Sequence, residues 1–216
     1  MTDNVAKYGF RWVRSRTGGP NMVIERAWVA TSASFDVNGG ASNCVLGKGD
    51  PIFQQSDGSA TLCLGNETTD SSTVLGIVQS FEYKDTVRNV MTKLGPGIPS
   101  DLAWGTNLAF QTIAWYCPAH TAVWSVAVDD IVTATTEAGY QAFIGENCEH
   151  ILTGASGATR VSPKLDISQH ATTNTFLWKI IGIDRTVENQ DFAEDNVRLL
   201  VIANSTLSSQ QAILGI

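Results

Sequence analysis

Short segments of alternating apolar and polar residues dominate the chain, and clusters of Gly, Asn, Asp and Ser separate them. In residues 121–128, Trp124, Val126 and Val128 fall on one face of an extended chain, and the intervening residues fall on the other. This alternation is typical of a half-buried strand. We therefore predict a strand here whose Trp124 face is buried.

Near the C-terminus, residues 175–183 place Trp178 and Ile180 on one face, and residues 197–202 form a second apolar segment. The polar residues 188–191 between them are typical of a connection. The two segments therefore predict an antiparallel pair of strands.

Four more strands are predicted in the first half of the chain, at 22–30, 51–55, 60–64 and 74–83. Gly58 indicates a tight hairpin between two of them, because glycine adopts positive φ at little cost. Residues 85–94 are predicted to form a short helix that begins at the N-cap Asp85 and ends at the Gly-Pro-Gly of residues 95–97.

Many short strands and little helix predict a mainly β protein, either an antiparallel β-barrel or a β-sandwich, with long loops and one short helix. A chain of 216 residues suits one compact domain. We divide it into an extended N-terminal arm, residues 1–20, and a single β-rich body, residues 21–216.

The charge is distributed unevenly along the chain. The whole chain carries a formal net charge of −7, which argues against coating a nucleic acid. Residues 1–16 carry four cations against Asp3, a net +3, which leaves −10 on the remainder. Two interpretations are open: these charges solvate a terminus, or the arm docks on an acidic partner.

No membrane partner is expected, because the longest strongly apolar run, residues 199–203, is far shorter than the roughly 20 residues that cross a bilayer. Residues 1–7 lack the apolar core of a secretory signal, so we expect synthesis and folding in a cytoplasm.

Catalytic and metal-binding motifs are absent from the sequence. The cysteines are widely spaced and predict buried thiols, and Cys148-Glu149-His150 is only a fragment of a metal site. Ser156 lies in a Gly-Ala-Ser-Gly string that lacks the spacing of a nucleophile elbow. We therefore predict no cofactor, no metal and no enzymatic activity. The remaining cysteines are Cys44, Cys63 and Cys117, and the other histidines are His120 and His170.

A family resemblance is more informative than any catalytic motif. Residues 8–14 read Tyr-Gly-Phe-Arg-Trp-Val-Arg and precede Gly18-Gly19. This opening resembles the Gly-Phe-Arg-Pro-Val start of tailed-bacteriophage capsid decoration (cement) proteins, with Trp12 in the place of proline. Similar fragments follow in the same order over nearly the whole chain: Gly49-Asp50-Pro51-Ile52, Asp57-Gly58, 75–83, 123–129, Ile144-Gly145-Glu146-Asn147, 154–157, Leu165-Asp166 and 177–182.

The resemblance implies a virion protein on the outer surface of an icosahedral capsid, where it bridges subunits of the major capsid protein and stabilises the expanded shell. This role requires no catalytic chemistry. Symmetry favours a homotrimer, with a dimer as the alternative. The expected capsid-binding residues form an extended arm that adds a strand to a neighbour's sheet: Tyr8, Phe10, Arg11, Trp12, Arg14 and Arg16.

Alternative interpretations remain open. One alternative to partner binding is that Phe10 and Trp12 cap the domain's own core, since aromatic residues are buried where a fold allows it. A second function is a carbohydrate-binding or adhesin-like β-module of a phage tail or fibre, with exposed tryptophans as platforms. Candidates for such a platform are Trp12, Trp28, Trp104 and Trp115. A third is a hydrolase that combines Ser156 or a thiol with one histidine and an acid.

Overall fold

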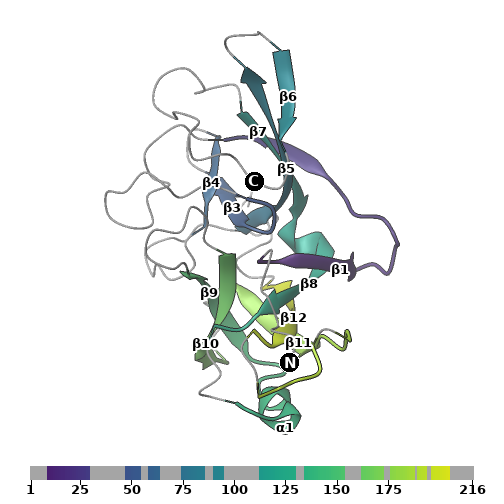
Figure 1. The fold of residues 1–216 in the computed structure, drawn as a ribbon, viewed down its shortest axis with the longest axis vertical. Helices are drawn as coiled ribbons and strands as arrows, with labels where there is room; N and C mark the ends of the chain where they lie inside the picture. The colour runs from purple at the N-terminus through teal and green to yellow at the C-terminus, as the bar shows by residue number, and fades with distance from the viewer. Residues whose placement is uncertain are drawn as a thin grey trace, which may run out of the picture.

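The computed structural model of the chain contains two antiparallel sheets, one above the other in Figure 1. The structure describes residues 9–29, 47–54, 58–63, 74–85, 90–94, 112–129, 134–153, 162–172, 176–187, 189–193 and 196–204.

Sheet A, the lower sheet in Figure 1, has six strands. Their order across the sheet is β1 (Arg11–Ser15), β8 (Ala122–Ala127), β12 (Arg198–Ala203), β11 (Trp178–Ile183), β9 (Asn147–Thr153) and β10 (Ser162–Ala171).

Sheet B, the upper sheet, also has six strands. Five follow the order β2 (Glu25–Trp28), β7 (Thr112–Pro118), β5 (Val74–Asp85), β3 (Pro51–Gln54) and β4 (Ala60–Leu62), and β6 (Val90–Leu94) pairs with β5. Between β7 and β8 lies the short 3-10 helix η2 (Ala119–Thr121).

Both sheets curl. A parallel bridge between Val29 and Ala60 joins the chain after β2 to β4, so the two outer strands of sheet B approach each other. A similar bridge joins Val128, after β8, to Leu165 in β10 of sheet A. The mainly β, antiparallel class predicted from the sequence is therefore confirmed.

The N-terminal ribbon, which we define as residues 11–28, links the two sheets. The segment β7–η2–β8 leaves sheet B and enters sheet A as one continuous stretch. The ribbon lies antiparallel beside it: Arg11 is in register with Ser125 in sheet A, and Trp28 with Ile113 in sheet B. The connection between β1 and β2 projects from the flank of the molecule in Figure 1.

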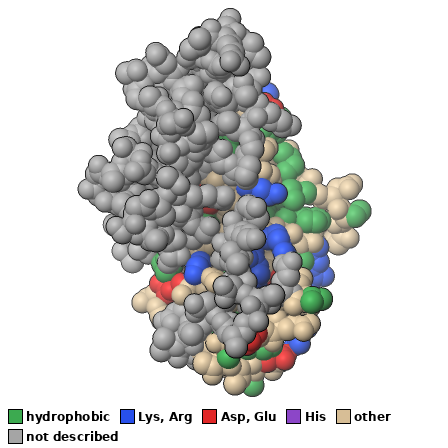
Figure 2. All heavy atoms as spheres, viewed as in Figure 1, with side chains coloured by type: hydrophobic (Ala, Val, Ile, Leu, Met, Phe, Trp, Pro, Cys, Tyr) green, Lys and Arg blue, Asp and Glu red, His purple; other side chains and the backbone are tan. Residues whose placement is uncertain are grey.

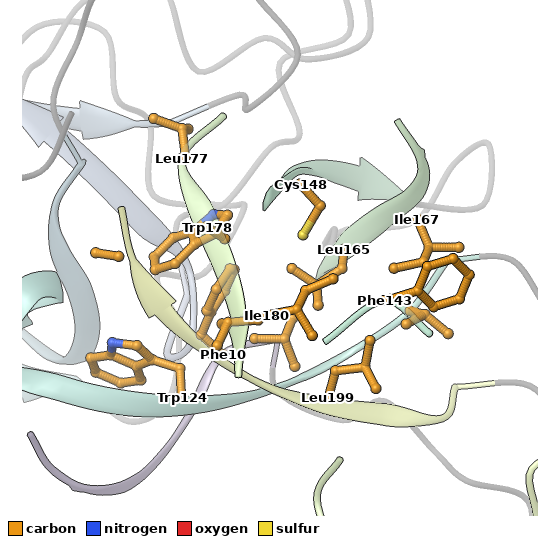
Figure 3. Packing of buried hydrophobic residues seen from close by; sticks show 14 of the residues in the cluster. Phe10, Trp124, Phe143, Cys148, Leu165, Ile167, Leu177, Trp178, Ile180 and Leu199 are labelled. Atoms are coloured by element: carbon orange, nitrogen blue, oxygen red, sulfur yellow. The ribbon is translucent and has the colours of Figure 1, made fainter. Parts of the chain in front are cut away.

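The largest core cluster lies mainly over sheet A, and its centre is drawn in Figure 3. Trp124 and Trp178 are fully buried, which confirms the predicted inner faces of both strands. Every residue of β8 is buried, including Ser125, because both faces of this strand are covered. Alternation alone predicted one buried face there.

The predicted hairpin and the predicted C-terminal pair are both present. β3 pairs antiparallel with β4, and Gly58 between them has a φ of +84°. β11 pairs antiparallel with β12. The polar connection before β12 contains Asn189, whose buried side chain accepts from Arg198 N at 2.7 Å and donates to Arg198 O at 2.9 Å.

The predicted helix at 85–94 is wrong. β5 continues to Asp85, and Val90–Leu94 forms β6, which pairs back on β5 with Phe81 opposite Leu94. A long neighbouring strand offered these residues cross-strand partners, and tertiary pairing overrode a weak helical signal. The described helix is instead α1 (Glu137–Gln141), whose N-cap Thr136 accepts a hydrogen bond from Gly139 N at 3.2 Å.

Candidate functional site

The predicted capsid-binding arm is the first place to look for a site. Tyr8 lies outside the described residues. Phe10 has an exposed fraction of 2 %, and its ring centroid lies 4.3 Å from that of Trp178 (Figure 3). The prediction that Phe10 anchors the protein to a partner is therefore wrong: its side chain fills the protein's own core.

The described part of the arm is also not separate from the body. Residues 11–15 do form a strand, as predicted, but β1 pairs with β8 of the same chain and not with a neighbour. Trp12 packs against the core cluster, half-buried, directly opposite Trp124. An amphipathic strand next to an available sheet edge of its own chain has the lowest entropy cost of pairing there.

The start of β1 depends on a tight backbone turn. Gly9 has a φ of +53°, a conformation that side-chain-bearing residues rarely adopt. A Cβ at this position would lie 2.6 Å from the Pro163 ring and 2.7 Å from Gly49 O. The neighbouring Phe10 N donates to the same carbonyl of Gly49 at 3.0 Å. The chain can enter the core at Phe10 only through glycine.

A partly buried polar network holds β1 in place. The Arg198 guanidinium donates to Gly9 O at 3.1 Å and to Ser125 O at 2.7 Å, and the Ser125 hydroxyl bonds to the Asp184 carboxylate. Arg11 adds an ion pair to the same carboxylate, with Nη2 3.6 Å from Oδ2. Arg11, predicted to meet a partner's carboxylate, thus already has one within its own chain.

Arg14 and Arg16 are exposed, as the docking hypothesis requires. The Arg16 side chain donates from Nη1 to His120 O at 3.3 Å, and its backbone N donates to Thr121 O at 2.8 Å. Farther along the ribbon, Arg26 is exposed too.

Large apolar side chains accompany these arginines. Val23, Ile24 and Trp28 have exposed fractions of 47 %, 42 % and 52 %. Among the described residues only two other large apolar side chains, Ile144 and Val187, are exposed. We use the name ribbon face for six exposed residues of the ribbon: Arg14, Arg16, Val23, Ile24, Arg26 and Trp28. In Figure 2, basic and apolar side chains adjoin on the flank where β1 and its connection to β2 lie.

The ribbon face is positively charged on an acidic protein. Residues 9–29 contain four arginines and one acid, Glu25, so this segment carries +3 in a chain of −7. The Glu25 carboxylate accepts a hydrogen bond from the Tyr116 hydroxyl at 2.8 Å. Burial, followed by the bond to Glu25 and its charge, raises the pKa of Tyr116, so the hydroxyl stays a donor at ordinary pH. The one acid of the segment is therefore engaged by the body.

The outer face of sheet B carries a second aromatic residue. Arg26 is opposite Trp115 in the register of β2 with β7, and Trp28 is opposite Ile113. Residues directly opposite in an antiparallel pair share a face, so Trp28 and Trp115 are diagonal neighbours, about 7–8 Å apart. Trp115 is only partly exposed, and its indole nitrogen is buried without a hydrogen-bond partner. Of the other predicted platform residues, Trp12 is in sheet A, and Trp104 lies outside the described residues.

His150 is a structural residue and not a base that faces a substrate. The Trp178 indole N–H can only donate, so His150 Nδ1 accepts it at 3.1 Å. The proton is then on Nε2, which donates to Cys63 O at 2.8 Å. Burial lowers the pKa of His150 to about 4, although the Cys63 bond opposes this shift. The neutral imidazole links the end of β4 in sheet B to β11 in sheet A.

The other titratable groups do not converge on one place. His120 is exposed, and His170 pairs with Glu146 and lies against the ring of Phe143. Burial raises the pKa of the buried Cys117 and Cys148 thiols, while Thr121 opposes the shift at Cys117, so neither is a thiolate nucleophile. Cys63 is buried as well, which confirms the predicted buried thiols, except at Cys44, which lies outside the described residues together with Ser156.

Glu149 in β9 is a partly buried carboxyl group with a raised pKa. Burial raises its pKa to about 8; a backbone hydrogen bond from Leu177 opposes the shift, and the cross-strand Asp166 adds to it. In the described part of the chain, no three His, Cys, Asp or Glu side chains are grouped as metal ligands.

Comparison with known proteins adds no relative: no family model, no curated protein and no solved structure matches the chain. No helix of the described segments combines the length and apolarity needed to span a bilayer.

Sequence reasoning missed three residues of the ribbon face: Val23, Ile24 and Arg26. The available signal was the pair Val23-Ile24 directly before a charged strand, because adjacent apolar residues point to opposite sides of an extended chain and cannot share one buried face.

Proposed function

We propose that the protein is a non-enzymatic virion structural protein that decorates the outer surface of an icosahedral phage capsid and stabilises it by bridging subunits of the major capsid protein. The observation that carries this proposal is the ribbon face, an exposed basic and apolar surface on an acidic β-rich body. The sequence resemblance to decoration proteins supplies the class of partner.

The ribbon face has the composition of a protein–protein contact. Tryptophan and arginine are the residues most often found at the energetic centre of interfaces. β2 is held in register by β7 over four residues, so its side chains are already ordered before binding. A preordered surface loses little conformational entropy when it binds, and more of the contact energy remains as affinity.

A passive clamp stabilises a shell without chemistry. Binding to the expanded shell, and not to its separated subunits, stabilises that shell by mass action. If the protein is a homotrimer, as symmetry favours, each copy offers its own ribbon face. Three contacts on one oligomer strengthen each other through effective concentration.

The test is binding of the purified protein to empty expanded capsids that lack it. We expect saturable occupancy on sedimentation with the capsids, and a higher temperature of capsid disruption in its presence. The double variant Arg14→Glu, Arg26→Glu should lower occupancy. The matched control is Lys179→Glu, which reverses an exposed strand cation in sheet A. Absence of binding by the wild-type protein would reject the proposal.

A second candidate is a carbohydrate-binding module of a phage tail or fibre, favoured by the shared face of Trp28 and Trp115. Indole rings stack on the apolar face of pyranose sugars. Affinity electrophoresis in gels that contain host polysaccharide would detect it: retardation that Trp28→Ala abolishes, without capsid binding, would favour this candidate.

A further inference from the structure

We infer that an extended acidic segment of the partner pairs with the outer edge of β2 and continues sheet B. The inference rests on the proposed function only for the identity of the partner, the major capsid protein. The edge itself, its side chains and its charge are properties of this chain.

β2 is the outermost strand on its side of sheet B, and among the described strands it pairs only with β7. Its far edge presents main-chain N–H and C=O groups to whatever lies beside it. The edge ends abruptly, because Val29 is buried and forms the bridge to Ala60. Alternate residues of β2 direct their N–H and C=O groups away from β7, so β2 offers a short template for strand addition.

Proteins usually protect such edges with charged side chains and avoid exposed apolar ones. Here Arg26 and Glu25 supply charge, yet Val23, Ile24 and Trp28 expose large apolar surfaces on the same six-residue stretch. An edge that only needs protection from self-association would not expose these apolar side chains next to its charges. An edge that a partner covers would.

Charge and alternation define the occupant. Arg26 and Trp28 are two positions apart in a strand and share a face, so residues opposite them on an added strand share that face as well. An acidic side chain opposite Arg26 and an apolar one opposite Trp28 complement both. The partner segment thus carries the pattern acidic, any residue, apolar. Glu25 does not compete for Arg26, because the Tyr116 hydroxyl holds its carboxylate.

A soluble probe separates this inference from the capsid proposal. The probe, which we call the glutamate–valine peptide, is end-blocked and repeats Glu-Thr-Val-Thr, so that glutamate and valine lie two positions apart on one face. Its binding is measured by titration calorimetry against the full-length protein. A lysine–valine peptide of the same length tests charge. A glutamate–valine peptide with N-methylated amides on alternate residues tests main-chain pairing, because it keeps the charge and cannot form the ladder.

We expect the glutamate–valine peptide to bind and both control peptides to fail. Trp28→Ala should weaken binding about 30-fold, the effect of removing an anchor residue. Arg26→Glu should weaken it at least about tenfold, and the loss should shrink near 1 M salt, where the screening length is about 3 Å. Lys179→Glu, the matched control, should bind as the wild type does.

The outcomes distinguish the two claims. Equal binding of the N-methylated peptide would overturn strand addition, and equal binding of the lysine peptide would overturn the acidic partner. A dimer of the free protein that Arg26→Glu disrupts would show that a second copy occupies the edge, and would also overturn the inference. Peptide binding without capsid binding would leave the inference standing and reject the capsid as its partner.

Discussion

The two strands of the N-terminal ribbon have similar compositions but differ in how far their arginine and tryptophan side chains are buried. β1 contains Arg11 and Trp12, and β2 contains Arg26 and Trp28. In β1 the tryptophan packs against the core and the first arginine pairs with Asp184. In β2 both side chains are exposed. Basic and aromatic residues therefore fasten the ribbon at one end and present a surface at the other.

The difference in burial between β1 and β2 follows from the parts of the protein next to which each strand begins. The chain before β1 enters the core through Gly9 and Phe10 and meets the buried Ser125–Asp184–Arg198 network. β2 covers the edge of a sheet whose inner face is already filled by β7 and β5 residues such as Phe81 and Ala114. The proposed contact surface is thus next to a structural anchor, and mutations can test the two separately.

The largest expected effect compares Phe10 with Trp28. Phe10→Ala should lower the free energy of unfolding by about 3–5 kcal/mol, because it removes a buried ring and leaves a cavity. Trp28→Ala should change it by less than about 0.5 kcal/mol, as an exposed substitution does. Urea unfolding measures both. Equal effects of the two substitutions would mean that the two ends of the ribbon do not differ.

Acid should loosen the buried end of the ribbon. The folded pKa of His150, about 4, lies below its ordinary value of 6.5, so the unfolded chain binds a proton that the folded chain refuses. As the pH falls from about 6.5 to about 4, this group should lower the free energy of unfolding by about 3 kcal/mol.

Urea unfolding over this pH range measures the slope, and hydrogen exchange should show greater loss of protection in β1 than in β2. His150→Gln should flatten the slope, while His120→Gln, at an exposed site, should leave it. Glu149 acts in the opposite direction: its folded pKa, about 8, is raised, so its contribution is present below about 4.5 and is lost as the pH rises through 8. In the Glu149→Gln variant, the pH dependence of stability contributed by His150 can be measured without that of Glu149.

Two glycines test the backbone turn that starts β1. Gly9→Ala should destabilise the protein by about 2 kcal/mol more than Gly18→Ala. Both residues have positive φ, +53° and +79°, so both substitutions carry the same conformational cost. Only Gly9 is surrounded, with atoms of Pro163 and Gly49 within 2.7 Å of the new Cβ, whereas Gly18 has none within 4 Å. Thermal unfolding of the two variants gives the difference, and equal losses would exclude crowding as its cause.

The smallest effect separates two arginines of the same strand. Arg11→Glu should cost about 1 kcal/mol of stability, because it replaces an ion pair with Asp184 by a repulsion. Arg14→Glu should leave stability nearly unchanged and lower capsid occupancy instead. Parallel measurements of unfolding and sedimentation with capsids check this, and a stability loss at Arg14 as large as that at Arg11 would contradict the assignment of Arg14 to the ribbon face.

Local patterns predicted much of the sheet content. Alternation located the strands around Trp124 and Trp178, and the glycine signal located the hairpin at Gly58. The strands β7, β9 and β10 went unpredicted, and residues 85–94 were assigned to a helix. β7 pairs with the distant strand β5, whereas β9 and β10 pair with each other and β6 pairs with the preceding strand β5. Local propensity did not reveal these pairings.

The sequence predicted a basic and aromatic surface near the N-terminus, but only some of the residues assigned to it are exposed. The basic charge and aromatic content near the N-terminus pointed to the segment that carries the ribbon face, and Arg14 and Arg16 belong to it. Phe10 and Arg11 are not, because the first is in the core and the second is paired with Asp184. The sequence of a strand indicates that it will pair with another strand. It does not indicate which strand that partner will be.

By itself, then, the sequence determined the β class, the inner faces of its best strands and the charge contrast between ribbon and body, since each depends on residues close together in the chain. The tertiary structure alone decided that residues 11–15 pair with β8, that His150 stays neutral between the sheets, and that Trp28 remains exposed. These outcomes depend on which distant groups meet, and burial, hydrogen-bond partners and pKa shifts exist only once they have met.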